Sequence, residues 1–247
     1  MSFRSPRILA ALTVVTLTAG FALAFFVTPN DADQGFIQKI FYLHVPLAIC
    51  ALVGFIVAAI QAVLHLRSGN PKWDVRSYVS IHISIILGVA VLVTGAIWAR
   101  ASWGKWFVWE EPTLVSFLIV FLLYCTYYPL RYAIEDRERQ ARYASVFAIT
   151  AGAFVPLNFI AVRMAESLVH PRVFATADGG LTPKMTLTFL VCLAGMALLW
   201  ETLVRFELAA KSSRARLGRL RRALEGEETS MAASRIAPLP REAAGTG

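Results

Sequence analysis

Charged side chains are scarce in this sequence of 247 residues. Only 16% of the residues are Asp, Glu, Lys or Arg, whereas 57% are hydrophobic. Ordinary soluble domains have about 25% charged and about 45–50% apolar residues. A chain with so few charges cannot cover a water-facing surface, so a soluble globular domain is excluded. The net charge of +8 leaves two interpretations, a nucleic-acid binder or a membrane protein with basic loops on one side.

Cysteines and common enzyme motifs are also few or lacking. The sequence has three cysteines and no CxxC or CxxCH motif, which excludes a thioredoxin-like dithiol and a covalently attached c-type haem. All three cysteines fall in apolar runs, so we expect small buried side chains. No P-loop, GxSxG or HExxH motif is present. The sequence therefore predicts neither nucleotide hydrolysis nor a hydrolase, and we expect a binding protein rather than an enzyme.

Long apolar runs dominate what is present. A helix that crosses a bilayer needs about 20 apolar residues, and six runs qualify: Leu9–Val27, Phe41–Leu66, Val79–Trp98, Thr113–Leu130, Ala144–Val162 and Met185–Val204. They predict an all-α integral membrane protein with about six transmembrane helices. The first run has an alternative interpretation as a cleaved signal peptide, because Ala22-Leu23-Ala24 resembles a cleavage site.

The basic residues predict the orientation of these helices. Of the 24 lysines and arginines, six lie in the first, third and fifth loops or at their edges: Lys39, Arg100, Lys105, Arg163, Arg172 and Lys184. The other 18 lie in the termini and the even loops. Since basic loops stay in the cytoplasm, both termini are predicted to be cytoplasmic. The odd loops also hold six acidic residues, so the entire net charge is cytoplasmic and marks topology, not nucleic-acid binding.

We expect two regions along the chain. Residues 1–204 form the transmembrane domain, with a tryptophan-rich outer loop at 99–112 and a second outer loop at 163–184. Residues 205–247 form a basic cytoplasmic tail that is partly disordered. Within it, Arg214–Arg222 either lies on anionic lipid as an amphipathic helix or is a solvated topology anchor.

Four of the six tryptophans, Trp98, Trp103, Trp106 and Trp109, lie within twelve residues in and around the third loop. They form either an aromatic belt at the membrane surface or a platform for a planar hydrophobic ligand. If the loop is helical, the last three share one face. Arg100 and Lys105 are then placed to meet ligand carboxylates at the rim of this platform.

Topology sorts the four histidines into two pairs. His44 and His170 are on the outer side, and two neutral imidazoles at one depth can hold a haem iron from both faces. His65 and His82 are on the cytoplasmic side, where we expect ordinary hydrogen-bonded residues. The neighbouring carboxylates Glu110 and Glu111 act either as an acid–base pair or, as anchors, hold the loop and cap the fourth span.

The string Trp103-Gly104-Lys105-Trp106-Phe107-Val108-Trp109-Glu110 resembles the WGxxWxWD signature of the haem-handling family of cytochrome c biogenesis, which includes CcmC, CcmF and CcsA-type proteins. The contexts Tyr42–Pro46 and Val155–Asn158 resemble the CcmC branch in particular. Glu110 stands where the family has Asp, and Phe107 replaces a frequent Trp. The first change keeps the charge, and the second removes an indole N–H donor but keeps the apolar contact.

The resemblance implies a haem-binding protein of the bacterial inner membrane. It would hold non-covalent haem b at the outer face, with His44 and His170 as axial ligands, and present it to the haem chaperone CcmE. CcmA, CcmB and CcmD would be further partners, in addition to membrane lipid. The residues implied to bind the cofactor are Arg100, Trp103, Gly104, Lys105, Trp106, Phe107, Trp109 and Glu110. The alternatives are a b-type cytochrome that transfers electrons, a subunit that transports haem or another solute, and a purely structural membrane partner.

Overall fold

The computed structural model describes residues 6–170 and 181–236, with side chains described up to residue 225 except at position 161. By contacts the chain divides into two units, Met1–Phe206 and Glu207–Gly247. The helices are α1 (Pro6–Phe26), the 3-10 helix η1 (Phe36–Ile40), α2 (Phe41–Ser68), α3 (Pro71–Trp103), α4 (Pro112–Cys125), α5 (Tyr127–Tyr132), α6 (Arg137–Met164) and α7 (Pro183–Ile236).

Six helical segments of the described chain are long and apolar enough to span a membrane, which confirms the predicted all-α membrane fold. In the fourth segment, α4 and α5 together cover one span, Pro112–Tyr132. The break follows from Pro129, which has no N–H to donate to the carbonyl of Cys125 and whose ring crowds that carbonyl. Cys50, Cys125 and Cys192 are free thiols on helices; Cys50 and Cys192 are buried, as predicted, whereas Cys125 is only half-buried.

Capping residues set the two ends of α3 beyond its predicted apolar run. Asn70 caps the N-terminus by accepting a hydrogen bond from the Lys72 amide at 3.0 Å, and Pro71 occupies the first helical position, where its missing N–H costs nothing. At the other end Gly104 adopts φ +71°, a left-handed conformation that stops a helix and favours glycine. The helix therefore runs from Pro71 to Trp103, longer than the predicted Val79–Trp98.

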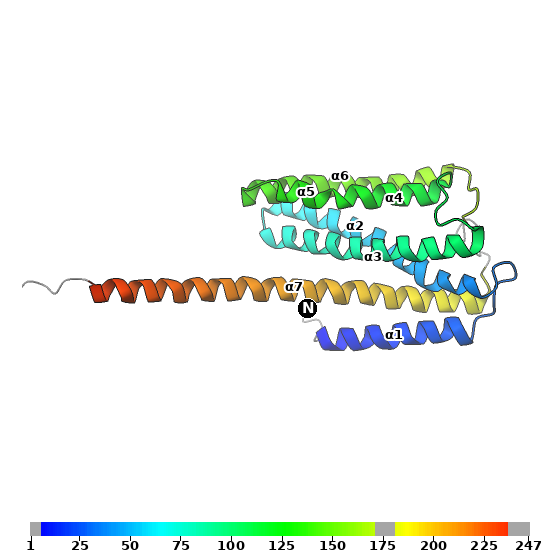
Figure 1. Cartoon of the computed structure of the whole chain (residues 1–247), viewed down its shortest axis with the longest axis horizontal. Coiled ribbons are helices and arrows are strands. Elements are labelled where there is room, and N and C mark those ends of the chain that lie inside the picture. The colour runs from blue at the N-terminus through cyan, green and yellow to red at the C-terminus, as the bar shows by residue number, and fades with distance from the viewer. Residues whose placement is uncertain (1–5, 171–180, 237–247) are drawn as a thin grey trace, which may run out of the picture. The chain divides into compact units, whose positions relative to one another are not determined.

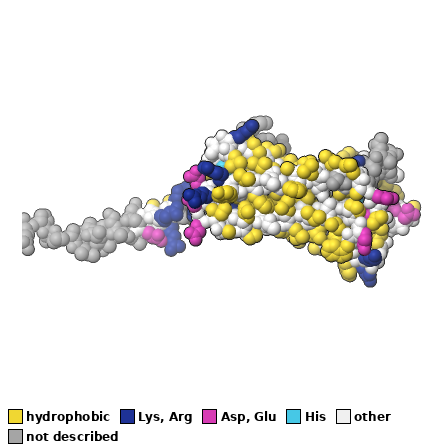
Figure 2. All heavy atoms as spheres, turned by 90° about the horizontal axis from the view of Figure 1, so that it is seen from above, with side chains coloured by type: hydrophobic (Ala, Val, Ile, Leu, Met, Phe, Trp, Pro, Cys, Tyr) yellow, Lys and Arg dark blue, Asp and Glu magenta, His cyan; other side chains and the backbone are white. Residues whose placement is uncertain are grey.

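The first unit is a layered helical bundle. α2 and α3 pack side by side at its centre, with α4, α5 and α6 on one side and with α1 and the first part of α7 on the other (Figure 1). Close approach depends on small residues, since a Cβ on Gly54 of α2 would clash with Ser84 Oγ and would lie 2.6 Å from Trp200 Nε1. Side chains on the visible face form a broad hydrophobic band with charges gathered at its ends (Figure 2), as expected for a surface that meets lipid.

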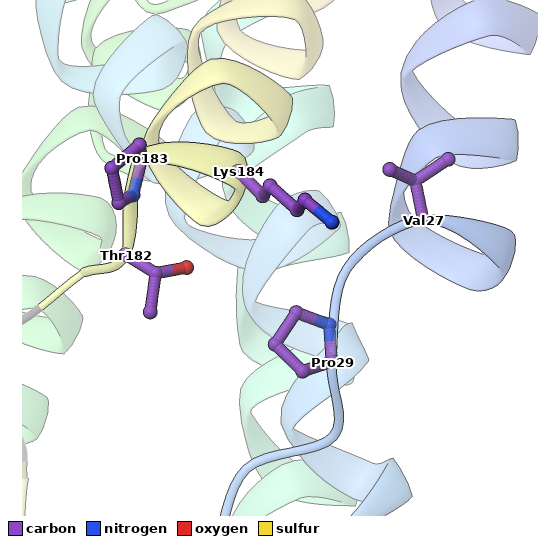
Figure 3. Close-up of a pocket in the computed structure, with 5 residues that line it drawn as sticks. All are labelled: Val27, Pro29, Thr182, Pro183 and Lys184. Atoms are coloured by element: carbon purple, nitrogen blue, oxygen red, sulfur yellow. The ribbon is translucent and has the colours of Figure 1, made fainter.

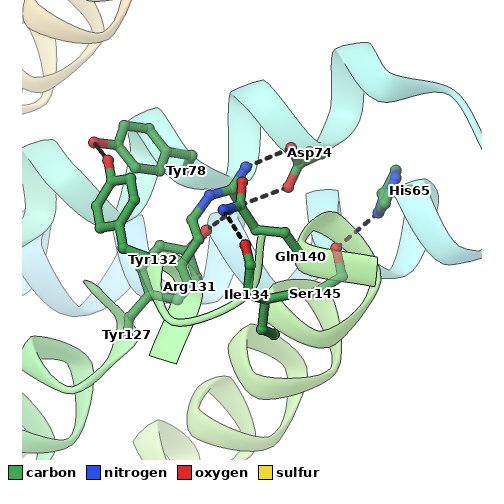
Figure 4. A network of polar contacts seen from close by, with 9 residues as sticks. All are labelled: His65, Asp74, Tyr78, Tyr127, Arg131, Tyr132, Ile134, Gln140 and Ser145. Atoms are coloured by element: carbon green, nitrogen blue, oxygen red, sulfur yellow. Dashed lines mark hydrogen bonds and ion pairs between the residues drawn. The ribbon is translucent and has the colours of Figure 1, made fainter. Parts of the chain in front are cut away.

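The end of the bundle that carries the short connections 69–70 and 133–136 holds a buried charge pair (Figure 4). Arg131 donates two hydrogen bonds to Asp74, both 2.7 Å long, and a third to Tyr127 OH at 2.8 Å. His65 is hydrogen-bonded to Ser145 Oγ at 2.8 Å. His82 is likewise bonded to Tyr128 OH at 2.6 Å, so both of these histidines are ordinary hydrogen-bonded residues, as predicted.

The second unit consists, in its described part, of the helical residues from Glu207 to Ile236. This region was predicted to be part of the tail, and it is helical up to Ile236. Leu217, Leu220 and Leu224 are each more than 60% exposed, and their spacing of three and four residues places them on one helix face. Arginines 214, 216, 219, 221 and 222 alternate with them along the sequence.

Candidate functional site

Three connections meet at the opposite end of the bundle, which we call the three-loop end: residues 27–35 before η1, 104–111 between α3 and α4, and the segment that follows α6 from residue 165 (Figure 1). They are joined by specific contacts. Trp98 near the end of α3 donates its indole N–H to Gln34 Oε1 at 2.7 Å, which ties the first connection to α3. Both predicted iron ligands, His44 and His170, lie at this end.

His44 lies in the first turn of α2, half-buried against the last turns of α3. Its Nδ1 is 2.9 Å from Thr94 Oγ1, and its ring lies edge-on to Trp98 with the centroids 5.7 Å apart. Gly95 provides the space between the two helices, because a Cβ there would lie 2.9 Å from His44 Cε1. Thr94, Gly95 and Trp98 of α3 therefore fix the position of this imidazole.

Hydrogen-bond accounting favours one of the two neutral tautomers of His44. Thr94 has one hydroxyl proton, and Thr94 Oγ1 donates it to the Ala90 carbonyl at 2.7 Å. With its proton used there, Thr94 Oγ1 is left to accept from His44, an assignment that places the ring proton on Nδ1. Nε2 then keeps its lone pair. Such a partner on the second ring nitrogen is how proteins orient metal-binding histidines, and Thr94 was not recognised in the sequence.

His170 lies at the end of the described part of the fifth connection, half-buried. Its ring packs against Trp103, the last residue of α3, at 61° and 6.4 Å between centroids. Its carbonyl accepts a hydrogen bond from Ser167 Oγ at 2.7 Å, which closes a short turn. The two histidines thus contact two tryptophans that lie five residues apart on one helix.

Glu111 connects this turn to α4. The carboxylate is fully buried. Oε2 accepts hydrogen bonds from three consecutive amides, those of Leu168 (2.9 Å), Val169 (2.9 Å) and His170 (3.2 Å). Oε1 accepts from the Thr113 amide at 3.4 Å and so caps α4.

The same contacts determine the ionisation of Glu111. Burial by itself raises the pKa of this carboxyl, but hydrogen bonds from the four backbone amides outweigh burial and lower the pKa below its usual value. Glu111 is therefore an anion at neutral pH, which suits an acceptor and not a proton donor. Of the two roles predicted for this residue, anchoring and capping is confirmed.

The tryptophan-rich connection differs from the predicted helical face. Trp98 and Trp103 belong to α3, and the left-handed Gly104 ends the helix before Trp106. The prediction that Trp103, Trp106 and Trp109 share a helix face is therefore wrong. Trp106 and Trp109 are 62% and 69% exposed, with Phe107 packed against Trp109 at 4.7 Å. The four tryptophans thus form two pairs. Trp98 and Trp103 are half-buried on α3, and Trp106 and Trp109 are exposed on the connection.

The basic residues of the odd loops and Glu110 differ in how far the protein itself engages them. Arg100 donates to the Gly104 carbonyl, and its guanidinium lies 6.0 Å from the ring centre of Trp106. Lys105 and Glu110 are exposed. Arg163 lies 5.0 Å from the ring centre of Phe159, and Arg172 lies outside the described residues. Arg100 therefore lies beside the exposed Trp106, and Lys105 precedes it directly in the sequence.

A pocket of about 490 Å³ opens elsewhere at this end, between the ends of α1 and α7 (Figure 3). It is lined by Val27, Pro29, Thr182, Pro183 and Lys184. None of the residues predicted to bind a cofactor lines it. The candidate site is therefore the surface around His44, His170 and the tryptophans, and not this pocket.

The predicted iron ligands at the three-loop end are two imidazoles. In the described residues no three His, Cys, Asp or Glu side chains are grouped so as to hold a metal ion. Each imidazole lies against a tryptophan ring, and imidazole is a good ligand for iron. Two buried hydroxyls that flank the connection, Ser102 Oγ and Thr113 Oγ1, have no hydrogen-bond partner within the described structure.

Comparisons with known proteins agree on one family. Residues 1–223 match the family model described as CcmC, Heme exporter protein C. The chain is 32% identical over 165 residues to Heme exporter protein C of Rhodobacter capsulatus, covering 67% of each chain. It is 30% identical over 202 residues to the protein of the same name from Haemophilus influenzae, covering 81% of this chain and 82% of that one. A ccmC-like mitochondrial protein of Marchantia polymorpha, named for cytochrome c biosynthesis, is 31% identical over 170 residues, covering 69% and 72%.

Proposed function

Because the chain belongs to the Heme exporter protein C family, we propose that it binds haem b non-covalently as its cargo during cytochrome c maturation. His44 and His170 are the axial ligands of the iron in this proposal. Trp103, Trp106, Phe107 and Trp109 supply apolar contact to the macrocycle, and Gly104 lets the backbone approach it closely.

The observation that carries this proposal is the placement of the two histidines. Each one lies edge-on to a tryptophan of the last two turns of α3, Trp98 for His44 and Trp103 for His170. Those tryptophans are separated by five residues, or about 7.5 Å along the helix axis. His44 also keeps Nε2 available, since Thr94 takes Nδ1.

Polar groups around the macrocycle complete the proposed site. Haem carries two propionates, and the positively charged Arg100 and Lys105 lie beside Trp106 and directly before it in the sequence, respectively. The buried hydroxyls of Ser102 and Thr113 are free to donate to a carboxylate. Glu110 follows the aromatic residues directly, and its negative charge disfavours a propionate at that end of the connection.

We place the three-loop end on the outer side of the bacterial inner membrane and both termini in the cytoplasm, because the excess of Lys and Arg lies in the other loops and the termini. A site at the outer membrane surface is accessible to an acceptor in the periplasm. The acceptor in this proposal is the periplasmic chaperone CcmE, with CcmA, CcmB and CcmD as membrane-associated partners.

The test is a haem spectrum of the purified full-length protein. We expect a six-coordinate, low-spin bis-imidazole spectrum that is lost in the His44→Ala/His170→Ala double variant. The double variant His65→Ala/His82→Ala is the matched control, because it removes two histidines from the other end of the bundle, and it should retain the spectrum. An unchanged spectrum without His44 and His170 would refute the ligand assignment.

Delivery is tested separately from binding. Co-expression with CcmE should produce chaperone with covalently attached haem, and Trp106→Ala with Trp109→Ala should reduce the labelled fraction. A b-type cytochrome would instead show electron transfer with full turnover and no dependence of chaperone labelling on this protein. Normal labelling of CcmE in its absence would contradict the proposed delivery.

A further inference from the structure

The buried Glu111 carboxylate is unusual because backbone amides of the turn at residues 167–170, and not a basic side chain, are its partners. A carboxylate loses much hydration free energy on burial and normally retains a basic partner. No ion pair involving Glu111 is present in the described structure, and its hydrogen-bond donors are the backbone amides of four residues. The backbone of a loop is therefore organised around one side chain.

The geometry of the turn follows from this arrangement. Three successive N–H groups point at one oxygen only when the backbone curls into an anion-binding concavity. An extended segment cannot do this, because its successive N–H groups point in alternating directions. Ser167 closes the same turn from the other side, with Oγ 2.7 Å from the His170 carbonyl. Both the N–H and the C=O of His170 are consequently fixed.

We infer that Glu111 is the positioning residue for His170, which it orients through the backbone without touching the haem. This inference rests on the proposed function, in which His170 binds the iron. Fixing the amide of a residue and of the two residues before it fixes the point from which its side chain departs. The Trp103 ring then restricts the imidazole itself, so the ligand is preorganised by one carboxylate and one aromatic ring.

The inference also explains the place of Glu111 in the chain. It is the N-cap of α4, a helix held in the bundle by its packing on α3 and α6. A carboxylate on a free loop could not hold a second loop in place, whereas one fixed by a helix start can. The position follows the last residue of the tryptophan signature, so the same short segment supplies the platform and positions the distant ligand.

The experiment compares the full-length protein with Glu111→Ala and with Glu166→Gln, purified with haem. Glu166 lies in the same connection, is exposed, and makes none of the hydrogen bonds described here, so its variant removes one negative charge without removing the anchor. For Glu111→Ala we expect a change from six-coordinate low-spin to five-coordinate high-spin haem, with His44 still bound. Added imidazole should restore the low-spin spectrum. Glu166→Gln should keep the wild-type spectrum.

A second comparison separates positioning from general destabilisation. In a His170→Ala background, Glu111→Ala should change haem affinity less than twofold. In the wild-type background it should lower haem affinity about 10- to 100-fold. Equal losses in both backgrounds would show that Glu111 does not act through His170. Failure of imidazole to restore the spectrum would overturn the inference in the same way.

Hydrogen exchange distinguishes failure of this inference from failure of the proposed function. The amides of residues 168–170 should exchange about 10- to 100-fold faster in Glu111→Ala, because hydrogen bonds to a charged group are lost. This readout needs no haem. Faster exchange with no bis-imidazole spectrum in the wild type would retain the anchor but refute the ligand role, and with it the inference. Unchanged exchange would refute the anchor itself.

Discussion

Replacing Thr94 by valine tests the orientation of His44 with little change of shape. Valine keeps the branched side chain of threonine but has no hydroxyl, so Nδ1–H of His44 loses its acceptor at 2.9 Å. The ring stays packed against Trp98 and Gly95. What changes is the preference for the tautomer that leaves Nε2 available for iron.

The size of the effect follows from the lost hydrogen bond. Leaving a half-buried N–H without a partner costs about 1–3 kcal/mol, and the protein avoids this cost by turning the ring or moving the proton. Loss of the hydrogen-bond partner on the other ring nitrogen of a metal-binding histidine typically lowers the affinity for the metal about 10- to 100-fold. We therefore expect haem affinity to fall by that factor, which corresponds to about 1.4–2.8 kcal/mol.

The assay is a haem titration of the purified apoprotein, followed by its absorption spectrum. Thr150→Val is the matched control, because Thr150 Oγ1 bonds only to the carbonyl four residues earlier, that of Val146, at 3.1 Å. Thr94 makes the same kind of backbone bond to Ala90, so the control removes that contribution alone. Equal affinity of the Thr94 and Thr150 variants would refute the role of Thr94 and the tautomer deduced from it.

Two further predictions concern close contacts at the two ends of the bundle. Gly95→Ala should lower the affinity for haem and broaden the haem spectrum, because the new Cβ would lie 2.9 Å from His44 Cε1. Gly218→Ala is the control and should change neither, because a Cβ there would have nothing within 4 Å. Equal spectra of the two variants would contradict the packing of α2 on α3. Asp74→Ala should lower the free energy of unfolding by about 3–5 kcal/mol, because it leaves the buried Arg131 without its carboxylate. Thermal unfolding in detergent measures this loss, and a change in melting temperature below 1–2 °C would contradict it.

The sequence predicts the helices well and their ends poorly. Apolar runs identify six spans because a bilayer requires them, yet hydropathy does not respond to the groups that end a helix. α3 extends eight residues before its apolar run because Asn70 and Pro71 start it, and it extends five residues after that run because Gly104 stops it. Pro129, which lies inside a predicted span, breaks that span into α4 and α5.

The candidate site is predictable in its residue types but not in its contacts. Periodicity gave the wrong conformation for the tryptophan connection, because one glycine at φ +71° outweighs a spacing of three. The carboxylate of Glu111 meets amides more than fifty residues away, and no local pattern reveals such a pairing. Thr94 did leave a signal, because it lies one helical turn before Trp98 and therefore on the same face, toward which His44 packs.

The cap of α4 has a mechanical consequence. α4 presents Ile119 and Leu122, 58% and 52% exposed, on a surface that faces lipid or a neighbouring membrane protein. A displacement of α4 along its axis by a single residue rise, about 1.5 Å, would carry the Glu111 carboxylate with it. Hydrogen bonds of 2.9 Å do not survive such a stretch, so the turn at 167–170 must either follow the helix or separate from it. A shift of α4 would therefore act directly on the turn that carries His170.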